Sequence, residues 1–139
     1  MKIGLLQINP TVGDIDGNAR LILDAARQAA ADGADLVISP ELALVGYLPR
    51  DLLLNPAFVR RAWTAAADLA ATMRGLPPAL IGLPEPNPSD QGRPLFNAAV
   101  LLRDGVIGGR FRKALLPTYD VFDEDRYFEP VHGPQVVDV

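Results

Sequence analysis

The sequence contains no cysteine and a single histidine, His132, and each scarcity excludes a kind of site. Without cysteine, the 139 residues can form no disulfide, no thiolate metal site and no cysteine nucleophile of their own. One histidine cannot build a histidine-rich metal centre, and no serine or threonine has a histidine near it in sequence, so a Ser-His-Asp triad has no support. We therefore predict no metal site, and we interpret His132, which precedes Gly133, as a loop residue.

Clusters of basic residues and long apolar runs are also absent. The net charge is −4, and Lys and Arg are not grouped as phosphate neutralisation requires, which argues against a nucleic-acid partner. The apolar runs are shorter than a membrane span, and the amino-terminal run is too short for a signal peptide, so we expect a cytoplasmic protein with no membrane partner. With 49% apolar and 22% charged residues, the composition is that of a single globular domain over residues 1–139.

The hydrophobic pattern of the first half alternates between strands and helices. Residues 2–8, 35–39 and 79–83 are short apolar runs bounded by turn-forming residues, which is typical of strands. The Ala-rich segments 19–31 and 56–74 have a helical period. Strands that alternate with helices predict an α/β fold with a parallel sheet at its start.

Capping signals bound both predicted helices. Asn18 or Asp16 can cap the first helix, and Gly33 can end it. Asn55 is a suitable N-cap for the second helix because Pro56 follows at the first helical position.

Asp104-Gly105 is the strongest turn signal in the second half. It lies between the apolar runs 95–103 and 106–113, and a two-residue Asp-Gly turn joins antiparallel strands because both residues need a positive φ. The sheet is therefore predicted to be mixed. The remaining segments are interpreted as loops at 40–54, 84–94 and 114–129, with short helical turns at 51–54 and within the last of these loops, and as the start of a strand at 136–139.

Glu41 directly follows the predicted strand 35–39. In α/β sheets, chemistry collects just past the carboxyl ends of the strands. Pro40 and Leu42 on either side are apolar, and an ionised carboxylate in such surroundings is costly to bury unless it has a partner. On this pattern alone, a solvated loop glutamate that caps the next turn is the favoured alternative.

Lys113 ends the second strand of the predicted hairpin. Taken alone it is an ordinary solvated lysine, since edge strands commonly carry lysine. If it met Glu41, however, each group would offset the desolvation of the other. A glutamate base beside a lysine that stabilises an oxyanion is suited to attack on an amide carbonyl. The pair lacks a nucleophile, and the obvious hydroxyl candidates are Thr11, Ser39, Ser89 and Thr118.

Four motifs that together span most of the chain are similar to those of a known enzyme family. They are Gln7–Asn18, Pro40–Tyr47 followed by Asp51–Leu54, Phe96–Ala99, and Arg112–Phe128. The glutamate and lysine motifs resemble the nitrilase superfamily, the carbon–nitrogen hydrolases. The first motif and the Val-Phe-Asp-Glu-x-Arg-Tyr-Phe sequence at 121–128 resemble one branch of it, the amino-terminal glutaminase domains of glutamine-dependent NAD synthetases.

The resemblance implies an α-β-β-α sandwich and a Glu-Lys-Cys triad. Glu41 matches the general base of that triad, and Lys113 matches its oxyanion-stabilising lysine. Glu124 is similar to an auxiliary acidic residue beside the triad. The residues that match the lining of the family's glutamine pocket are Tyr47, Tyr119 and Phe122.

The cysteine of the family lies in a motif beyond the lysine stretch, and this chain stops at Val139 before such a motif. The resemblance therefore implies an amino-terminal fragment that is inactive alone. Its sandwich would be incomplete at the carboxyl end. Glutamine would be the substrate, and the missing synthetase domain would be the partner. No cofactor is expected in this chain, since ATP and Mg²⁺ would serve that other domain, and the complete protein would form a homo-oligomer.

Two other interpretations stay open. The chain could be a fragment of a free-standing amidase of the same superfamily, or a catalytically dead interaction module. Half a sandwich would leave an open sheet edge and exposed apolar surface, which favours association or instability.

Overall fold

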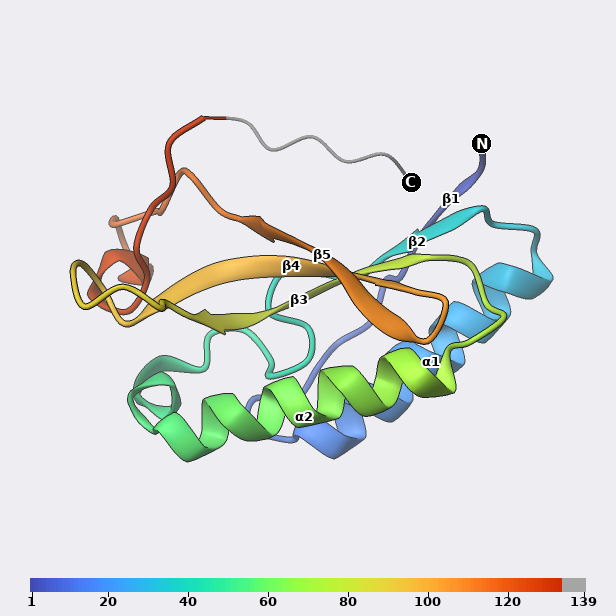
Figure 1. The fold of residues 1–139 in the computed structure, drawn as a ribbon, viewed down its shortest axis with the longest axis horizontal. Helices are drawn as coiled ribbons and strands as arrows, with labels where there is room; N and C mark the ends of the chain where they lie inside the picture. Colours follow the sequence, from blue (N-terminus) through green and yellow to red (C-terminus); the bar gives the residue numbers. More distant parts are fainter. Residues whose placement is uncertain (134–139) are drawn as a thin grey trace.

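Five strands form one mixed sheet in the part of the chain that the structure describes, residues 1–133 of a computed structural model (Figure 1). The strands are β1 (Ile3–Leu5), β2 (Leu36–Ile38), β3 (Ala79–Pro86), β4 (Leu95–Arg103) and β5 (Val106–Arg112). They lie in the sheet in sequence order. The first three are parallel, whereas β4 and β5 are antiparallel to their neighbours, so the predicted α/β fold with a mixed sheet is confirmed.

Two long helices, α1 (Ile15–Ala31) and α2 (Pro56–Thr72), cover the same face of the sheet (Figure 1). Apolar side chains from both layers meet in one core, and burial of this apolar surface is the main favourable term in folding. The side chains with no exposed surface in this core include Ile22, Val37, Ala66, Ile81 and Val100. In residues 1–133, neither helix combines the length and the apolar character needed to cross a bilayer.

Helix α1 begins at Ile15 rather than at the predicted residue 19. Asp14 caps it, because its Oδ1 accepts a hydrogen bond of 3.0 Å from the backbone N–H of Gly17. The prediction that Asn18 or Asp16 caps this helix is therefore wrong, and both residues lie inside its first turn.

The side chain of Asn18 serves a different purpose. Its Oδ1 accepts from the backbone N–H of Thr11 at 2.8 Å, and its Nδ2 donates to the carbonyl of Leu44 at 3.2 Å. The residue is 2% exposed, so these bonds satisfy a buried amide. Asn18 thus joins α1 to the segment that follows β2.

The start of α2 matches its prediction. A 3₁₀ helix, η1 (Arg50–Leu54), precedes it, which confirms the helical turn expected at 51–54. Asn55 then caps α2 through its Oδ1, which accepts from the backbone N–H of Ala57 at 2.9 Å, and Pro56 occupies the first helical position.

The predicted loop at 84–94 is wrong in its first three residues, because β3 continues through Pro84 to Pro86. Proline has no N–H to donate to a ladder, so it is tolerated only where its nitrogen faces away from a paired strand. The N–H of Gly82 points away from β4, since it donates to Ser39 Oγ at 3.0 Å. Pro84 and Pro86 follow at two-residue steps, so their nitrogens face the same side as that of Gly82 and leave the pairing with β4 intact.

The predicted hairpin is confirmed at Asp104-Gly105, where φ is +55° and +86° respectively. A second 3₁₀ helix, η2 (Glu124–Arg126), provides the helical turn expected within 114–129. The strand predicted to begin at 136–139 lies outside the described residues. The first predicted strand, at 2–8, pairs over only three residues, since β2 is equally short.

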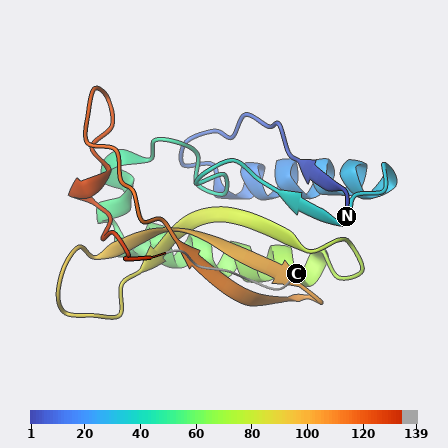
Figure 2. The same ribbon diagram turned by 90° about the horizontal axis from the view of Figure 1, so that it is seen from above.

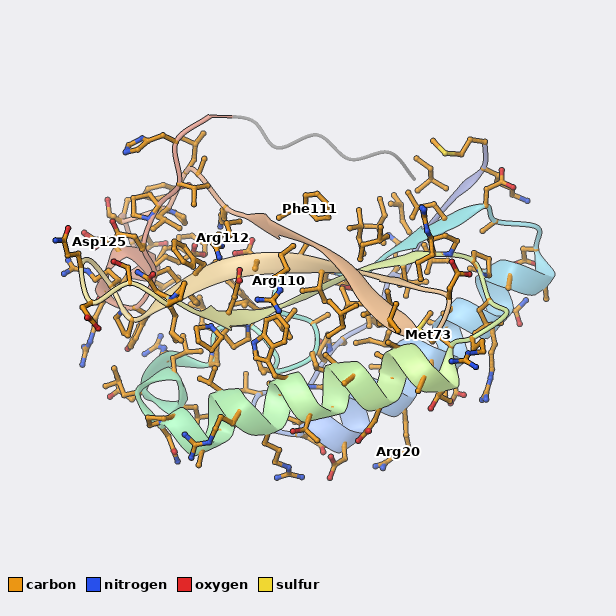
Figure 3. The ribbon with its side chains drawn as sticks, in the orientation of Figure 1. Arg20, Met73, Arg110, Phe111, Arg112 and Asp125 are labelled. Carbon is orange, nitrogen blue, oxygen red and sulfur yellow. The ribbon has the colours of Figure 1, made fainter. Side chains whose placement is uncertain are left out.

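The sheet face opposite the helices has no helix over it in residues 1–133, and the view from above shows the strands in front of both helices (Figure 2). Leu5 pairs with Ile38, and Ile38 with Leu80, in a row across this face, where Leu5 is 71% exposed. Arg110 and Phe111 point to opposite faces of β5, with Phe111 on the open one (Figure 3). The described residues thus form one helical layer and one sheet of the predicted sandwich.

Candidate active site

Glu41 lies in the turn that directly follows β2, beside β3. Gly82 on β3 makes this close approach possible, because an added Cβ there would lie 2.5 Å from the backbone nitrogen of Leu42 and 2.8 Å from the carbonyl oxygen of Pro40. Ser39 completes the junction, since its hydroxyl accepts from the N–H of Gly82 and donates to the carbonyl of Pro40, each at 3.0 Å. That hydroxyl is therefore engaged in structure and is not a free nucleophile.

Lys113 follows the last residue of β5. Its backbone N–H donates to the carbonyl of Asn97 at 2.8 Å, which continues the ladder between β4 and β5 by one residue. Its Nζ lies 2.7 Å from Glu41 Oε1 and 2.9 Å from Glu124 Oε2. The two strand-end residues selected from the sequence therefore meet, although 72 positions separate them.

Glu124, the first residue of η2, is 1% exposed. Its Oε1 accepts from the hydroxyl of Tyr47 at 3.0 Å and from Lys113 Nζ at 3.2 Å. A carboxylate buried to this extent needs such partners, because burial strongly disfavours an unpaired charge. The structure thus places the predicted auxiliary acid on the same lysine as Glu41.

Asn97 belongs to the motif Phe96–Ala99, but it was not predicted to be a member of this site. It lies in β4 and is 3% exposed, and its Nδ2 donates to Glu41 Oε1 at 2.6 Å and to Glu124 Oε2 at 3.3 Å. The available signal was a single amide within the apolar run that begins at Leu95, since a buried polar group in a central strand requires a partner.

Glu41, Asn97, Lys113 and Glu124 form a group that we call the charged cluster. The interactions within it stabilise its charges. Burial opposes ionisation of Glu41, but hydrogen bonds from Lys113 and Asn97 outweigh it and hold the pKa of this carboxyl below its ordinary value. Burial likewise disfavours the charged form of Lys113, yet its bonds to Glu41 and Glu124 raise the pKa of the ammonium group. Burial and the bond to Glu124 raise the pKa of Tyr47, so this hydroxyl stays protonated. At neutral pH the site therefore presents an ionised Glu41 in contact with a charged lysine.

The three aromatic residues expected near the substrate lie together. The rings of Tyr47 and Phe122 have centroids 6.3 Å apart, and those of Tyr119 and Phe122 are 5.6 Å apart in an edge-to-face arrangement. Tyr119 is 70% exposed, so the group has an open outer side. Through its bond to Glu124, Tyr47 joins this aromatic group to the charged cluster.

A groove of about 480 Å³ on the open sheet face runs past the charged cluster. Glu41, Asn97 and Lys113 line it together with apolar residues such as Ala99 and Phe111. An apolar wall with a few convergent polar groups is the usual form of a small-molecule site. His132, predicted to be a loop residue, is exposed in irregular structure. Within residues 1–133, there is no group of three or more His, Cys, Asp or Glu side chains that could hold a metal ion.

A second ionic cluster lies on the helical side of the sheet. Glu85 is 1% exposed, and Arg112 binds it through Nε at 2.8 Å and Nη2 at 2.9 Å. Arg110 adds a contact of 3.3 Å and stacks on Trp63 of α2, 4.6 Å from the ring centroid. Burial opposes the charge of Glu85, but the two arginines lower the pKa of its carboxyl. This cluster was not predicted, because it depends on the register of β3, β4 and β5.

Comparisons with known proteins agree with this geometry. The carbon-nitrogen hydrolase family matches residues 2–139. The glutamine-dependent NAD(+) synthetase of Synechocystis sp. is 52% identical over 129 residues, which cover 91% of this chain and 23% of that protein. The chain spans less than a quarter of the length of this curated relative.

Solved structures of related proteins share this fold. The glutamine-dependent NAD+ synthetase from Acinetobacter baumannii has a TM-score of 0.86 and 34% identity, over 99% of this chain and 25% of that one. A nitrilase-superfamily amidase from Nesterenkonia sp. AN1 has a TM-score of 0.77 and 28% identity, over 96% of this chain and 49% of its own. The same amidase has been solved with acrylamide added at its active-site cysteine.

Proposed function

The chain belongs to the carbon-nitrogen hydrolase family, and from this premise we propose that it is the amino-terminal part of a glutaminase domain in a glutamine-dependent NAD synthetase. The observation that carries the proposal is the contact of Lys113 Nζ with both Glu41 and Glu124 beside an open groove. An ionised carboxylate and a charged lysine at one groove wall can serve as the general base and the oxyanion donor when a thiol cleaves an amide.

In this proposal Glu41 is the general base. Its Oε1 accepts from Lys113 and Asn97, and neither of these donors bonds to its Oε2. Oε2 would accept the proton of a cysteine thiol, and the thiolate sulfur would attack the side-chain amide carbon of glutamine. The proton would then pass from Glu41 to the leaving nitrogen, so that ammonia departs and a thioester remains.

The cysteine must come from outside these 139 residues, which contain none. The proposal draws support from the Nesterenkonia amidase, whose active site contains a cysteine. Water would hydrolyse the thioester to glutamate: Glu41 would accept a proton from the water and pass it to the cysteine sulfur as the C–S bond breaks.

Lys113 would stabilise the tetrahedral oxyanion. Removal of one oxyanion donor from other enzymes costs about 3 kcal/mol of transition-state stabilisation. Glu124 would hold the lysine in its charged form and in position, since the two groups lie 2.9 Å apart. Tyr47, Tyr119 and Phe122 would line the pocket for the glutamine side chain.

The ammonia would serve the amidation of deamido-NAD in a synthetase domain outside this chain. ATP and Mg²⁺ would be needed by that domain, and we derive no step through them from these residues. The proposal includes a cytoplasmic location and a homo-oligomeric complete protein.

A free-standing amidase is the second candidate, and the fold similarity to the Nesterenkonia amidase favours it. The 52% identity to a synthetase, against 28% to the amidase, supports the first candidate instead. A catalytically dead interaction module is the third candidate, but the paired Glu41 and Lys113 would then have no evident use.

The test is Glu41→Gln in the complete protein, with Glu129→Gln as a matched control outside the cluster. Glutamine-dependent NAD synthesis should be abolished by Glu41→Gln, while synthesis from added ammonia continues. The control should retain both activities. Loss of both activities in Glu41→Gln would mean that Glu41 is structural, and an unchanged glutamine-dependent rate would overturn the proposal.

A further inference from the structure

The amide group of Asn97 lies between two carboxylates. Its Nδ2 is 2.6 Å from Glu41 Oε1 and 3.3 Å from Glu124 Oε2. Lys113 Nζ bridges the same two oxygens at 2.7 and 2.9 Å. The ionised Glu41 thus lies beside a second carboxyl group, and the donors of Asn97 and Lys113 are placed between the two.

An amide suits this position better than other side chains of similar size. Its NH₂ group supplies two N–H donors from one atom, one for each carboxylate, and it adds no charge. A serine would supply one donor, and an aspartate would supply none when ionised and would add a third negative charge. The backbone of Asn97 is also fixed, because its carbonyl accepts from the N–H of Lys113 at the end of the ladder between β4 and β5.

Oε1 of Glu41 is held from two sides, by Asn97 and by Lys113, and this fixes the plane of the carboxylate. The other oxygen, Oε2, accepts no hydrogen bond from Asn97 or Lys113, since both donate to Oε1. We propose that Asn97 is a positioning residue for Glu41, which holds Oε1 so that Oε2 is the oxygen that exchanges protons in the reaction. This inference rests on the function proposed above, and it assigns to Asn97 a role that acts through Glu41 and involves no contact with substrate.

The proposal predicts a change in pH dependence. The titratable side chains that face Glu41 are Lys113, Glu124 and Tyr47. Donors to the ionised form of Glu41 lower its pKa, so removal of the Asn97 donors should raise it. Activity that needs ionised Glu41 is lost as the pH falls through this pKa, so the acid limb of the rate profile should move to higher pH.

The experiment compares Asn97→Asp with Asn87→Asp in the complete protein. Asn87 lies in the loop after β3 and bonds only within that loop, so the same substitution there adds the same charge outside the cluster. For Asn97→Asp we expect a loss of about 10- to 100-fold in glutamine-dependent kcat, an acid limb shifted upward by about one pH unit, and unchanged use of added ammonia. Asn87→Asp should behave as the parent in all three measurements.

A second measurement separates this inference from the proposed function. Carboxyl NMR of the 139-residue chain, labelled at glutamate, follows the titration of Glu41 without any activity. If the Glu41 pKa rises in Asn97→Asp but the complete parent protein has no glutaminase activity, the proposed function is refuted while the contact of Asn97 with Glu41 stands.

An unchanged acid limb and an unchanged Glu41 titration would overturn the role of Asn97. If Asn97→Asp fails to fold, the same measurements on Asn97→Ser test the role of Asn97, because serine retains one donor. A partial upward shift of the acid limb is expected for Asn97→Ser, and a profile identical to that of the parent would again overturn the inference.

Discussion

Arg112 and Lys113 are consecutive residues whose charged groups lie on opposite faces of the sheet. Arg112 Nε is 2.8 Å from Glu85 on the helical side, and Lys113 Nζ is 2.7 Å from Glu41 on the open side. Successive side chains of an extended segment point to opposite faces, so one end of β5 joins a structural ion pair to a candidate catalytic one. A substitution in either cluster should therefore affect the geometry of the other, because Arg112 and Lys113 are adjacent in the backbone.

Replacement of Glu85 by glutamine should destabilise the fold. The two hydrogen bonds from Arg112 to this buried carboxylate are lost or weakened, and bonds to a charged group contribute about 1.5–3 kcal/mol. Urea unfolding of the 139-residue chain measures this change. Asp24→Asn, which breaks only the exposed pair with Arg27, is the control and should leave the unfolding midpoint unchanged. Equal midpoints for Glu85→Gln and the parent would show that the buried pair contributes nothing.

Stability should depend on pH in a direction set by the same groups. The pKa of Glu85 and that of Glu41 are lowered in the folded state from an ordinary value of 4.5, so their contribution is complete above that pH and is lost as the pH falls through the folded values. The pKa of Lys113 is raised from 10.5, so its contribution is present below pH 10.5 and is lost as the pH rises through its folded value. The free energy of unfolding should thus decline below pH 4.5, and Glu85→Gln should show a shallower decline than the parent.

Gly82→Ala should disturb the site through the backbone. The new Cβ would meet the backbone nitrogen of Leu42 at 2.5 Å, and backbone cannot yield as a flexible side chain can. Overpacking of this kind costs about 1–3 kcal/mol. Gly108→Ala is the matched control, since the contact of its Cβ is with Leu101 O at 3.9 Å. Carboxyl NMR should show a displaced Glu41 signal in the first variant alone, and an undisturbed signal would contradict this account of the turn.

The 139-residue chain should release no ammonia from glutamine. It contains Glu41 and Lys113 but no cysteine to attack the amide. An ammonia assay over hours, with the complete protein as the positive control, measures this directly. Measurable release by the isolated chain would mean that another group serves as the nucleophile.

Much of the fold was predictable because its signals are local. Asn55 with Pro56 marks the start of α2, and Asp104-Gly105 requires the positive φ values of a hairpin. The start of α1 was harder, because several adjacent residues are suitable caps and only the tertiary bonds of Asn18 decide among them.

The site was predictable where a charge follows a strand end. Glu41 and Lys113 have that position, and they meet because the turn at Glu41 lies against Gly82 of β3 and reaches Asn97 of β4. Asn97 and the pair Glu85–Arg112 were missed because their partners come from other strands. Which residues face each other depends on register, and no local pattern in the sequence reports it.

The prolines of β3 also bear on how this protein behaves at high concentration. With no N–H on their outer side, Pro84 and Pro86 cannot donate to a strand from another molecule. The carbonyl of Pro84 is also occupied, by the indole N–H of Trp63 at 2.9 Å. This edge of β3 is thus protected against edge-to-edge polymerisation, so we expect any aggregation of the chain to begin elsewhere.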